Sequence, residues 1–331
     1  MQGCRLSGVG SSVPTTILTN KDLESFVDTN DEWIVSRTGI KQRHILGKGE
    51  TLGGLAVTAS LKALEMAGVQ AADLDLVLFA TSSPDDLFGG ACQVQAAIGA
   101  KRAVSFDLTA ACSGFVVALV TGSQFIKTGT YKNVLVIGGD ALSRVIDWRD
   151  RGTCILFGDA CGAVVLTAST DGSCSMLGMD MHSDGNGQKN LHCLFSGEGN
   201  KPLLPDPESS ARAAYSNLYM NGTEVFKFAV RTVPTVIEAA LAKAGLTTAD
   251  VDWLVMHQAN QRILDAAAAR LGLPPHKVVS NLASYGNTSA ASIPLALDEA
   301  VRGGRVRAGD KIAMAGFGAG LTWAGAIVKW G

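Results

Sequence analysis

The feature of this sequence that most limits how it can fold is an internal repeat. Residues 63–75 and 240–252 each read as an Ala-rich helix, a glycine and an Asp-X-Asp motif, and every matched pair is 177 residues apart without a gap. The glycines, Gly68 and Gly245, are helix-stop signals at the same place in each copy. A chain that repeats itself in this way predicts a fold of two similar units.

The repeat continues into apolar segments that predict strands. The Asp-X-Asp motif leads into residues 76–80 in the first copy and 253–256 in the second. Two further pairs follow in the same order, 134–139 with 311–316 and 162–165 with 325–328. Near-continuous apolar strands are typical of sheets that are covered on both faces. The sequence therefore predicts an α/β fold of two halves, 1–170 and 171–331, each reading strand, helix, strand, helix, strand, strand, with buried helices between two sheets.

Composition excludes several classes of protein. The chain of 331 residues is 47% hydrophobic and 18% charged, with a net charge of −2, which favours a sizeable core and argues against a nucleic-acid partner. Residues 108–126 and 278–297 have the length of a membrane span, but the polar side chains within them favour buried core segments. Residues 181–214, rich in Gly, Ser, Asn and Pro, predict a long loop.

The cysteines argue against a metal or a disulfide framework. Seven cysteines without a Cys-X-X-Cys pair do not match a zinc ribbon, and they predict reduced thiols and a cytoplasmic location. The first residues lack the basic and apolar segments of a signal peptide. The glycine-rich turn at 316–320 lacks the spacing of a dinucleotide-binding loop. We therefore expect no metal and no cofactor.

Cys112 is the first candidate for chemistry. It lies where a polar turn leads into an apolar helix predicted over 115–126. The positive end of a helix and its free N–H groups lower the pKa of a thiol, so this position favours a thiolate. Small neighbours leave room for a substrate. The local sequence leaves open the alternative of an inert buried cysteine.

Two polar residues of the second half are further candidates. His257 immediately follows an apolar strand, where α/β sheets present ligand-binding groups, although a structural histidine is the alternative. Asn287 lies seven residues after Ser280, as Cys112 lies seven residues after Ser105. The repeat therefore predicts that Asn287 is the counterpart of Cys112 and that two helix starts face each other. A simple helix cap is the alternative for Asn287.

Taken together, these motifs resemble 3-oxoacyl-[acyl-carrier-protein] synthase III, a branch of the thiolase superfamily. The matching segments span nearly the whole chain: DEWIVSRTGI at 31–40, AACSGF at 110–115, RGT at 151–153, LFGD at 156–159, HQAN at 257–260, GNTSAAS at 286–292 and FGAG at 317–320. The resemblance implies the thiolase-like fold, a duplicated α/β sandwich with buried central helices. It also implies a condensing acyltransferase that initiates type II fatty acid synthesis.

The resemblance assigns the family's reaction to particular residues. Acetyl-CoA would acetylate Cys112, and malonyl-acyl carrier protein would then lose CO2 and condense to acetoacetyl-acyl carrier protein. His257 and Asn287 would donate hydrogen bonds to the enolate oxygen, and so would act in the second half-reaction. The backbone N–H groups of Cys112 and Ala319 would form the oxyanion hole, although the family commonly has Gly at the position of Ala319.

The resemblance also implies binding residues. Residues 29–32 have the spacing of a capping box, which would place Trp33 and Arg37 on one helix face as a clamp for adenine. The CoA-binding set is Thr29, Trp33, Arg37, Arg151, Gly222, Phe226, Ala259 and Asn260. The acidic carrier protein would dock on the basic side chains Lys227, Arg262 and Arg270. In a homodimer, Leu87 or Phe88 would reach the partner's acyl pocket, which Phe157 also lines.

Two alternatives of different class stay open at this point. A chalcone-synthase-like polyketide ketosynthase shares Cys, His and Asn, but it is usually longer and lacks the clamp of Trp33 and Arg37. A non-catalytic homologue would only bind acyl-CoA or carrier protein, and the complete set of reactive residues argues against it. Elongating ketosynthases use two histidines and thiolases a second cysteine in the last glycine-rich turn, which this chain lacks. The preferred length and branching of the primer are not determined by these motifs.

Overall fold

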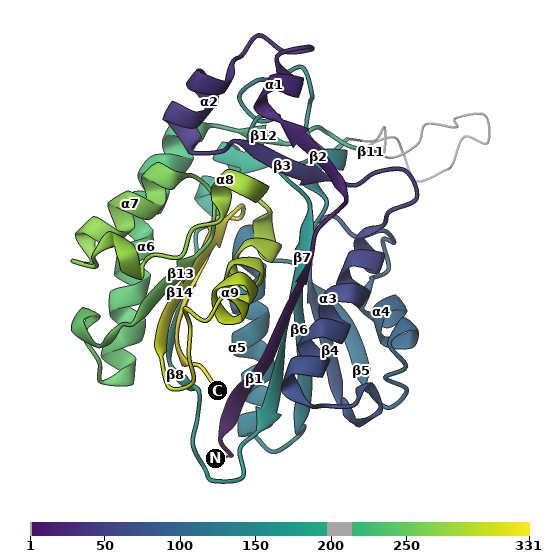
Figure 1. Cartoon of the computed structure of the whole chain (residues 1–331), viewed down its shortest axis with the longest axis vertical. Helices are drawn as coiled ribbons and strands as arrows, with labels where there is room; N and C mark the ends of the chain where they lie inside the picture. Colours follow the sequence, from purple (N-terminus) through teal and green to yellow (C-terminus); the bar gives the residue numbers. More distant parts are fainter. Residues whose placement is uncertain (1, 197–213) are drawn as a thin grey trace.

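The computed structural model describes residues 2–196 and 214–331. Figure 1 shows two sheets with a pair of helices between them and further helices on the outer face of each sheet. Both termini lie at one end of these layers, and short helices and strands form a cap at the opposite end (Figure 1). The predicted duplicated α/β sandwich is confirmed.

The first sheet is built from the first half of the chain. Its strands, in spatial order, are β1 (Cys4–Ser12), β7 (Ala160–Ala168), β6 (Asn133–Asp140), β4 (Leu76–Ala80) and β5 (Val104–Leu108). β4 pairs in parallel with β5 and β6, whereas β7 pairs antiparallel with β6 and β1. Every residue of β4 is buried, as expected for a strand covered by helices on both faces.

The second sheet repeats this order with one strand fewer. Its strands are β13 (Trp253–Met256), β14 (Lys311–Gly318), β15 (Thr322–Lys329) and β8 (Met176–Ser183). The strand predicted as the counterpart of β5 is reduced to a single bridge between Leu254 and Val278, because the chain turns into a short helix at Leu282. The predicted loop at 181–214 also begins too early. Residues 181–183 extend β8 along β15, because polar side chains are tolerated on an edge strand.

The helices form three layers. The central pair is α5 (Gly114–Lys127) and α9 (Ser292–Arg302), the first sheet is covered by α3 (Leu52–Ala67) and α4 (Ala91–Ala97), and the second by α6 (Gly222–Ala244) and α7 (Gln261–Arg270). α3 and α6 end at Gly68 and Gly245 in the left-handed conformation, with φ of 64° and 67°. The glycine signals of the repeat therefore mark the helix ends as predicted.

The cap contains the remaining elements. They are β2 (Thr16–Thr19), α1 (Asn20–Leu23), α2 (Asp31–Thr38), β3 (Gln42–Ile45), β9 (Leu191–His192), β10 (Phe195–Ser196), β11 (Ala214–Tyr215), β12 (Tyr219–Met220) and α8 (Leu282–Tyr285). The segment predicted as a loop at 181–214 thus contributes a 3-10 turn at Gly185–Asn190 and two short strands, and its residues 197–213 lie outside the described residues.

The described part of the chain contains no helix that is long and apolar enough to cross a membrane. The two apolar stretches at 108–126 and 278–297 instead supply most of α5 and the first half of α9, whose side chains are buried between the sheets. All seven cysteines are free thiols. In residues 2–196 and 214–331, no three His, Cys, Asp or Glu side chains are grouped closely enough to hold a metal ion.

Candidate active site

Two loops from different halves meet at the start of the central helices. Residues 109–113 lead into α5 through a 3-10 turn, and residues 287–291 lead into α9 through another. Each turn begins with a residue of positive φ, 47° at Ala111 and 50° at Ser289. Side chains with a Cβ rarely adopt this conformation, and such residues gather at functional sites.

This shared geometry corrects the predicted equivalence of Cys112 and Asn287. The positive-φ residues Ala111 and Ser289 are structural counterparts, so the counterpart of Cys112 is Ala290, and Asn287 lies three residues earlier. The prediction counted forward from the strand before each loop. That strand is missing in the second half, so the counting started from positions that are not equivalent.

Each loop is seated on a glycine of the opposite sheet. A Cβ on Gly138 of β6 would collide with the carbonyl oxygen of Ala290, and a Cβ on Gly316 of β14 would lie 2.8 Å from the Cα of Ser113. A Cβ on Gly318 would lie 2.8 Å from the backbone nitrogen of Cys112. The loop of each half therefore packs directly on the backbone of the opposite sheet, and these contacts leave no room for a side chain.

The loops line a cavity of about 1680 Å³ together with His257 and the final glycine-rich turn. Cys112, His257, Asn287 and Ala319 all line it, so the structure brings the four residues of the predicted reaction centre into one space. Cys112 follows β5, and His257 follows β13 directly. The reactive side chains thus lie beyond the carboxyl ends of strands in both sheets, where α/β folds place ligand sites.

Cys112 is 9% exposed, and its sulfur accepts a hydrogen bond from the hydroxyl of Ser289 at 3.3 Å. Burial raises the pKa of the Cys112 thiol to about 12, and the hydrogen bond from Ser289 lowers it only in part. The expected low thiol pKa is therefore contradicted, because the loss of hydration dominates. A protonated thiol needs a base before it can attack.

His257 supplies a nitrogen suited to that role. Its backbone N–H donates to the carbonyl of Ala315 at 2.8 Å, which holds it at the end of the β13–β14 pair. Its Nδ1 lies 2.8 Å from the Oγ of Ser292, and that hydroxyl donates its one proton to the carbonyl of Ser289 at 2.7 Å. Since the Ser292 oxygen can only accept from His257, Nδ1 carries the ring proton and Nε2 carries the lone pair.

The burial of His257 keeps its ring neutral. The side chain is 2% exposed and packs edge-on against Phe317, with 5.0 Å between ring centroids. This desolvation lowers the pKa of His257 to about 3. At neutral pH the cavity therefore contains a thiol and an unprotonated Nε2.

The orientation of Asn287 follows from one backbone contact. The N–H of Ser289 donates to the Asn287 side chain at 2.9 Å, so the accepting atom is the oxygen Oδ1. The amide nitrogen is thereby left as a donor. The backbone of Asn287 also exchanges hydrogen bonds with the chain at Leu156 and Gly158, which fixes the loop beside Phe157.

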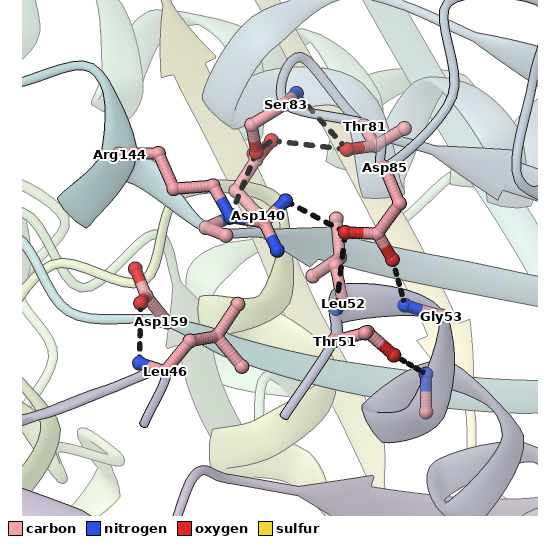
Figure 2. Close-up of polar contacts among 12 residues, drawn as sticks. Leu46, Thr51, Leu52, Gly53, Thr81, Ser83, Asp85, Asp140, Arg144 and Asp159 are labelled. Carbon is pink, nitrogen blue, oxygen red and sulfur yellow. Dashed lines mark hydrogen bonds and ion pairs between the residues drawn. The ribbon is translucent and has the colours of Figure 1, made fainter. Parts of the chain in front are cut away.

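Sequence reasoning missed Asp140, the last residue of β6. Its buried carboxylate accepts hydrogen bonds from Thr81 and Ser83, as Figure 2 shows, and from the backbone of Ser82 and Ala290. Burial raises the pKa of Asp140, while these donors oppose the rise. Its contact with the N–H of Ala290 pins the second loop. The signal in the sequence was an Asp ending an otherwise apolar strand.

The predicted clamp lies at the mouth of the cavity. The guanidinium groups of Arg37 and Arg151 lie 4.5 and 5.2 Å from the ring centroid of Trp33. The capping-box interpretation is wrong in detail: Asn30, not Thr29, caps α2 by accepting from the N–H of Trp33 at 2.8 Å, because its side chain lies one residue before the helix. The Thr29 hydroxyl is buried without a partner among the described residues.

The other predicted CoA residues continue from the clamp into the cavity. Gly222, Phe226, Ala259 and Asn260 all line it. Asn260 caps α7 by accepting from the N–H of Arg262, and its amide donates to the carbonyl of Arg37 at 3.0 Å. The clamp helix is thereby tied to the helix that follows His257.

The predicted docking residues differ in their distance from the cavity. Lys227 and Arg262 line its mouth, with Lys227 paired to Glu224 at 2.8 Å and Arg262 stacked 5.2 Å from the ring centroid of Phe226. Arg270 ends α7 and donates to the backbone carbonyl of Arg231 on α6 at 3.2 Å. It lies about 12 Å from Arg262 along the helix axis. The structure therefore separates Arg270 from the other two.

The predicted acyl-pocket residues lie in two settings. Phe157 is buried beside Asn287, whereas Leu87 and Phe88 are 77% and 95% exposed, although all three line the cavity. Asp85 anchors the loop that carries Leu87 and Phe88. Figure 2 shows its carboxylate accepting from backbone N–H groups at the start of α3 and from Arg144 at 2.7 Å. The exposed side chains of Leu87 and Phe88 thus lie on a loop that the contacts of Asp85 hold in place.

Comparison with known proteins gives the same answer along the whole chain. Models of 3-oxoacyl-[acyl-carrier-protein (ACP)] synthase III match residues 106–185 and, for its C-terminal part, 241–330. Beta-ketoacyl-[acyl-carrier-protein] synthase III of Microcystis aeruginosa is 59% identical over 326 residues, covering 98% of this chain and 97% of the relative.

Solved structures agree. Beta-ketoacyl-[acyl carrier protein] synthase III of Thermus thermophilus is 44% identical, with a TM-score of 0.90 and 99% of each chain covered. The priming beta-ketosynthase of the R1128 polyketide biosynthetic pathway is 38% identical, with a TM-score of 0.91, covering 99% of this chain and 96% of that one. The thiolase-like fold and the acyltransferase class that the motifs predict are confirmed. The chain belongs to the 3-oxoacyl-[acyl-carrier-protein] synthase III family of condensing enzymes, which initiate fatty acid synthesis.

Proposed function

We propose that this enzyme transfers an acetyl group from acetyl-CoA to Cys112 and condenses it with malonyl-acyl carrier protein to give acetoacetyl-acyl carrier protein, CO2 and CoA. The observation that carries the proposal is the cavity itself, which Cys112, His257 and Asn287 line together behind the clamp of Trp33 and Arg37. A thiol, a neutral base and an amide donor are the groups that covalent acyl transfer followed by enolate formation requires.

In the first half-reaction, the Cys112 sulfur attacks the thioester carbonyl of acetyl-CoA. The thiol proton passes to Nε2 of His257, which the tautomer leaves unprotonated. Backbone N–H groups of Cys112 and Ala319 stabilise the tetrahedral oxygen. The carbon–sulfur bond to CoA then breaks, and the CoA thiolate leaves and takes a proton from solvent. This gives His257 a role in acetylation beyond the one that the motifs predict.

In the second half-reaction, the negative malonyl carboxylate offsets the burial that disfavours a charged ring, so Nε2 of His257 keeps the proton that it took from Cys112. This Nε2 and the amide of Asn287 then donate to the thioester oxygen of the malonyl group. The carboxylate leaves as CO2, and its bonding electrons form the enolate that these donors stabilise. The enolate carbon attacks the acetyl carbonyl, the bond to Cys112 breaks, and the sulfur regains its proton from His257. Both residues thus return to their starting states.

The mouth of the cavity would bind the two carriers. The proposal places the adenine of CoA against Trp33 and the guanidinium groups of Arg37 and Arg151, because aromatic and guanidinium planes stack on a base. Lys227 and Arg262 would attract the acidic carrier protein at the same opening, with Arg270 contributing from farther along α7.

The proposal also includes assembly and surroundings. The enzyme would act as a cytoplasmic homodimer without metal or cofactor, and Leu87 or Phe88 would enter the partner's acyl pocket. The exposure of these two apolar side chains on a loop held by Asp85 supports this arrangement, because apolar groups at that exposure favour a partner.

Mass spectrometry of the intact protein tests the proposal. After incubation with acetyl-CoA, the wild-type protein should carry one acetyl group, and a peptide digest should place it on Cys112. Adding malonyl-acyl carrier protein should then remove the acetyl group and release CO2. A protein that binds acetyl-CoA without becoming acetylated would be a binding homologue and would overturn the proposal.

The polyketide alternative is tested in the same assay by the extender. A chalcone-synthase-like enzyme would condense with malonyl-CoA, whereas the proposed enzyme requires malonyl-acyl carrier protein. A series of acyl-CoA primers of increasing length and branching would then define which primer the cavity prefers. Efficient use of malonyl-CoA alone would favour the polyketide reaction.

A further inference from the structure

We propose that Ser289 is a positioning residue that holds all three reacting side chains in place, with one of its polar groups committed to each. The inference rests on the proposed function, because it takes Cys112, His257 and Asn287 as the reacting groups. Its basis is a set of hydrogen bonds that converge on a single buried serine, which is 2% exposed.

Each polar group of Ser289 has a different partner. Its hydroxyl donates to the sulfur of Cys112 at 3.3 Å, and its N–H donates to Oδ1 of Asn287 at 2.9 Å. Its carbonyl accepts from the hydroxyl of Ser292 at 2.7 Å, and that oxygen accepts from Nδ1 of His257 at 2.8 Å. The first contact acts on the nucleophile, the second aims the amide, and the third selects the tautomer.

The backbone conformation explains why one residue can make these contacts. Ser289 has a φ of 50°, which turns its peptide groups away from the directions of an ordinary helix start. The next residue is held by the hydrogen bond from the N–H of Ala290 to the buried carboxylate of Asp140 at 3.3 Å. The conformation is therefore imposed by the surrounding structure, and Asp140 is part of what imposes it.

The hydroxyl has a second role that depends on charge. Asp140 raises the pKa of Cys112 by its negative charge, whereas the hydrogen bond from Ser289 lowers it. The Ser289 hydroxyl donates its one proton to the Cys112 sulfur. As Cys112 loses its proton, the sulfur becomes the stronger acceptor, so the hydroxyl stabilises the thiolate when it forms.

These contacts can be separated by mutation. Ser289→Ala removes the hydroxyl but keeps the N–H and the carbonyl, so it should act on Cys112 while leaving the contacts to Asn287 and Ser292 in place. Ser292→Ala breaks the link from Ser289 to His257 and leaves the hydroxyl on Cys112. The two variants therefore should differ in which reacting group they perturb.

The test is the pH dependence of Cys112 alkylation by iodoacetamide, followed by mass spectrometry of the Cys112 peptide. Ser289→Ala should move the profile to higher pH and slow alkylation at a fixed lower pH by about tenfold or more, because a hydrogen bond to a charged sulfur is lost. Ser289→Gly, which tolerates positive φ, should give the same shift even where alanine is poorly accommodated.

The matched control is Ser113→Ala, which removes a buried hydroxyl next to Cys112 that donates to the carbonyl of Ala110 instead. Its alkylation profile should equal that of the wild type. An unchanged profile in both Ser289 variants would overturn the inference, as would an equal shift in Ser113→Ala.

The link from Ser289 through Ser292 to His257 is tested by nuclear magnetic resonance of the ring nitrogens of His257. Ser292→Ala should change the wild-type signals of a single Nδ1–H tautomer into those of a mixture. Unchanged signals would refute the claim that this link selects the tautomer of His257. Since neither measurement uses CoA or carrier protein, a failed acetylation assay with shifted alkylation would overturn the proposed function alone.

Discussion

The two loops at the centre of the molecule have the same backbone and different chemistry. In each, a residue of positive φ is followed by a 3-10 turn and a central helix. In the first loop the strained residue is Ala111, and the next residue is Cys112, the proposed nucleophile. In the second loop the strained residue is Ser289, and the counterpart of Cys112 is Ala290. One copy therefore presents a thiol, and the other presents the hydroxyl that donates a hydrogen bond to it.

The comparison teaches that the symmetry of the fold positions the site without dictating its residues. Both loops are seated on a glycine of the opposite sheet, and both gain rigidity from that close packing. The polar contacts are not symmetric. Those of Cys112 and Asn287 run to Ser289, a residue of the second loop, while His257 reaches it through Ser292.

The largest effect should come from the first loop. Cys112→Ser should lower both acetyl incorporation and condensation on the order of 1000-fold or more, because a hydroxyl is a far weaker nucleophile than a thiol at neutral pH. Incorporation of labelled acetyl groups measures the first step, and CO2 release measures the second. Cys174→Ser, which changes a partly exposed thiol outside the cavity, should behave as wild type. Full condensation by Cys112→Ser would remove the residue from the mechanism.

The second loop should affect one half-reaction more than the other. Asn287→Ala should lower the rate of malonyl decarboxylation by about 100- to 1000-fold, because a donor to the developing enolate is lost. Its acetylation by acetyl-CoA should change much less. His257→Ala should lower both rates, since the residue would serve as base and as donor. If acetylation in Asn287→Ala falls as far as decarboxylation, the assignment of Asn287 to the enolate is wrong.

A third test breaks the packing that the two loops share. Gly138→Ala and Gly316→Ala should each lower the free energy of unfolding by about 1–3 kcal/mol, because the added Cβ meets backbone atoms of the opposite half. Urea unfolding measures the change. Gly185→Ala is the control, since its Cβ would meet no atom within 4 Å. Wild-type stability in the first two variants would contradict the close packing of the loops.

The smallest effect should come from the mouth of the cavity. Arg262→Glu should raise the apparent KM for malonyl-acyl carrier protein several-fold at low salt, which corresponds to a loss of about 1 kcal/mol or less in binding free energy. The rate of acetyl transfer from CoA should not change. Arg270→Glu should do less, because Arg270 lies farther along α7 and already binds a backbone carbonyl of α6. The difference should shrink as salt screens the charges. Equal KM values for Arg262→Glu and wild type at low salt would show that Arg262 does not belong to a docking surface for the carrier protein.

Much of the fold could be predicted because its signals are local or periodic. The glycine stops and the apolar strands 76–80 and 253–256 match the observed elements to the residue, since helix ends and buried strands depend on nearby side chains. The fifth strand of the second sheet could not be predicted in this way. The apolar residues Val278 and Val279 lie at that position, but only Val278 forms a β-bridge, to Leu254. Whether such a bridge extends into a strand depends on the neighbouring strand.

For the site, too, some features could be predicted from the sequence and others could not. Motifs in the sequence were enough to select Cys112, His257 and Asn287 as candidates, and the structure places all three on one cavity. The protonation states were not predictable, since the pKa values of about 12 for Cys112 and about 3 for His257 arise from burial. Ser289 and Asp140 were also missed as functional residues. Asp140 is marked only as an Asp that ends an apolar strand, Ser289 has no distinctive local pattern, and the importance of both lies in what they contact.

The sequence by itself determined that the chain is a duplicated α/β sandwich and which residue types could react, because a repeat and short motifs are visible in the order of residues alone. Only the tertiary structure decided which residues are true counterparts, which nitrogen of His257 holds the proton and which serine links Cys112, Asn287 and His257. These depend on distances between residues far apart in the chain, such as the 3.3 Å between Ser289 and Cys112. Packing of the two halves sets such distances, and no local pattern encodes them.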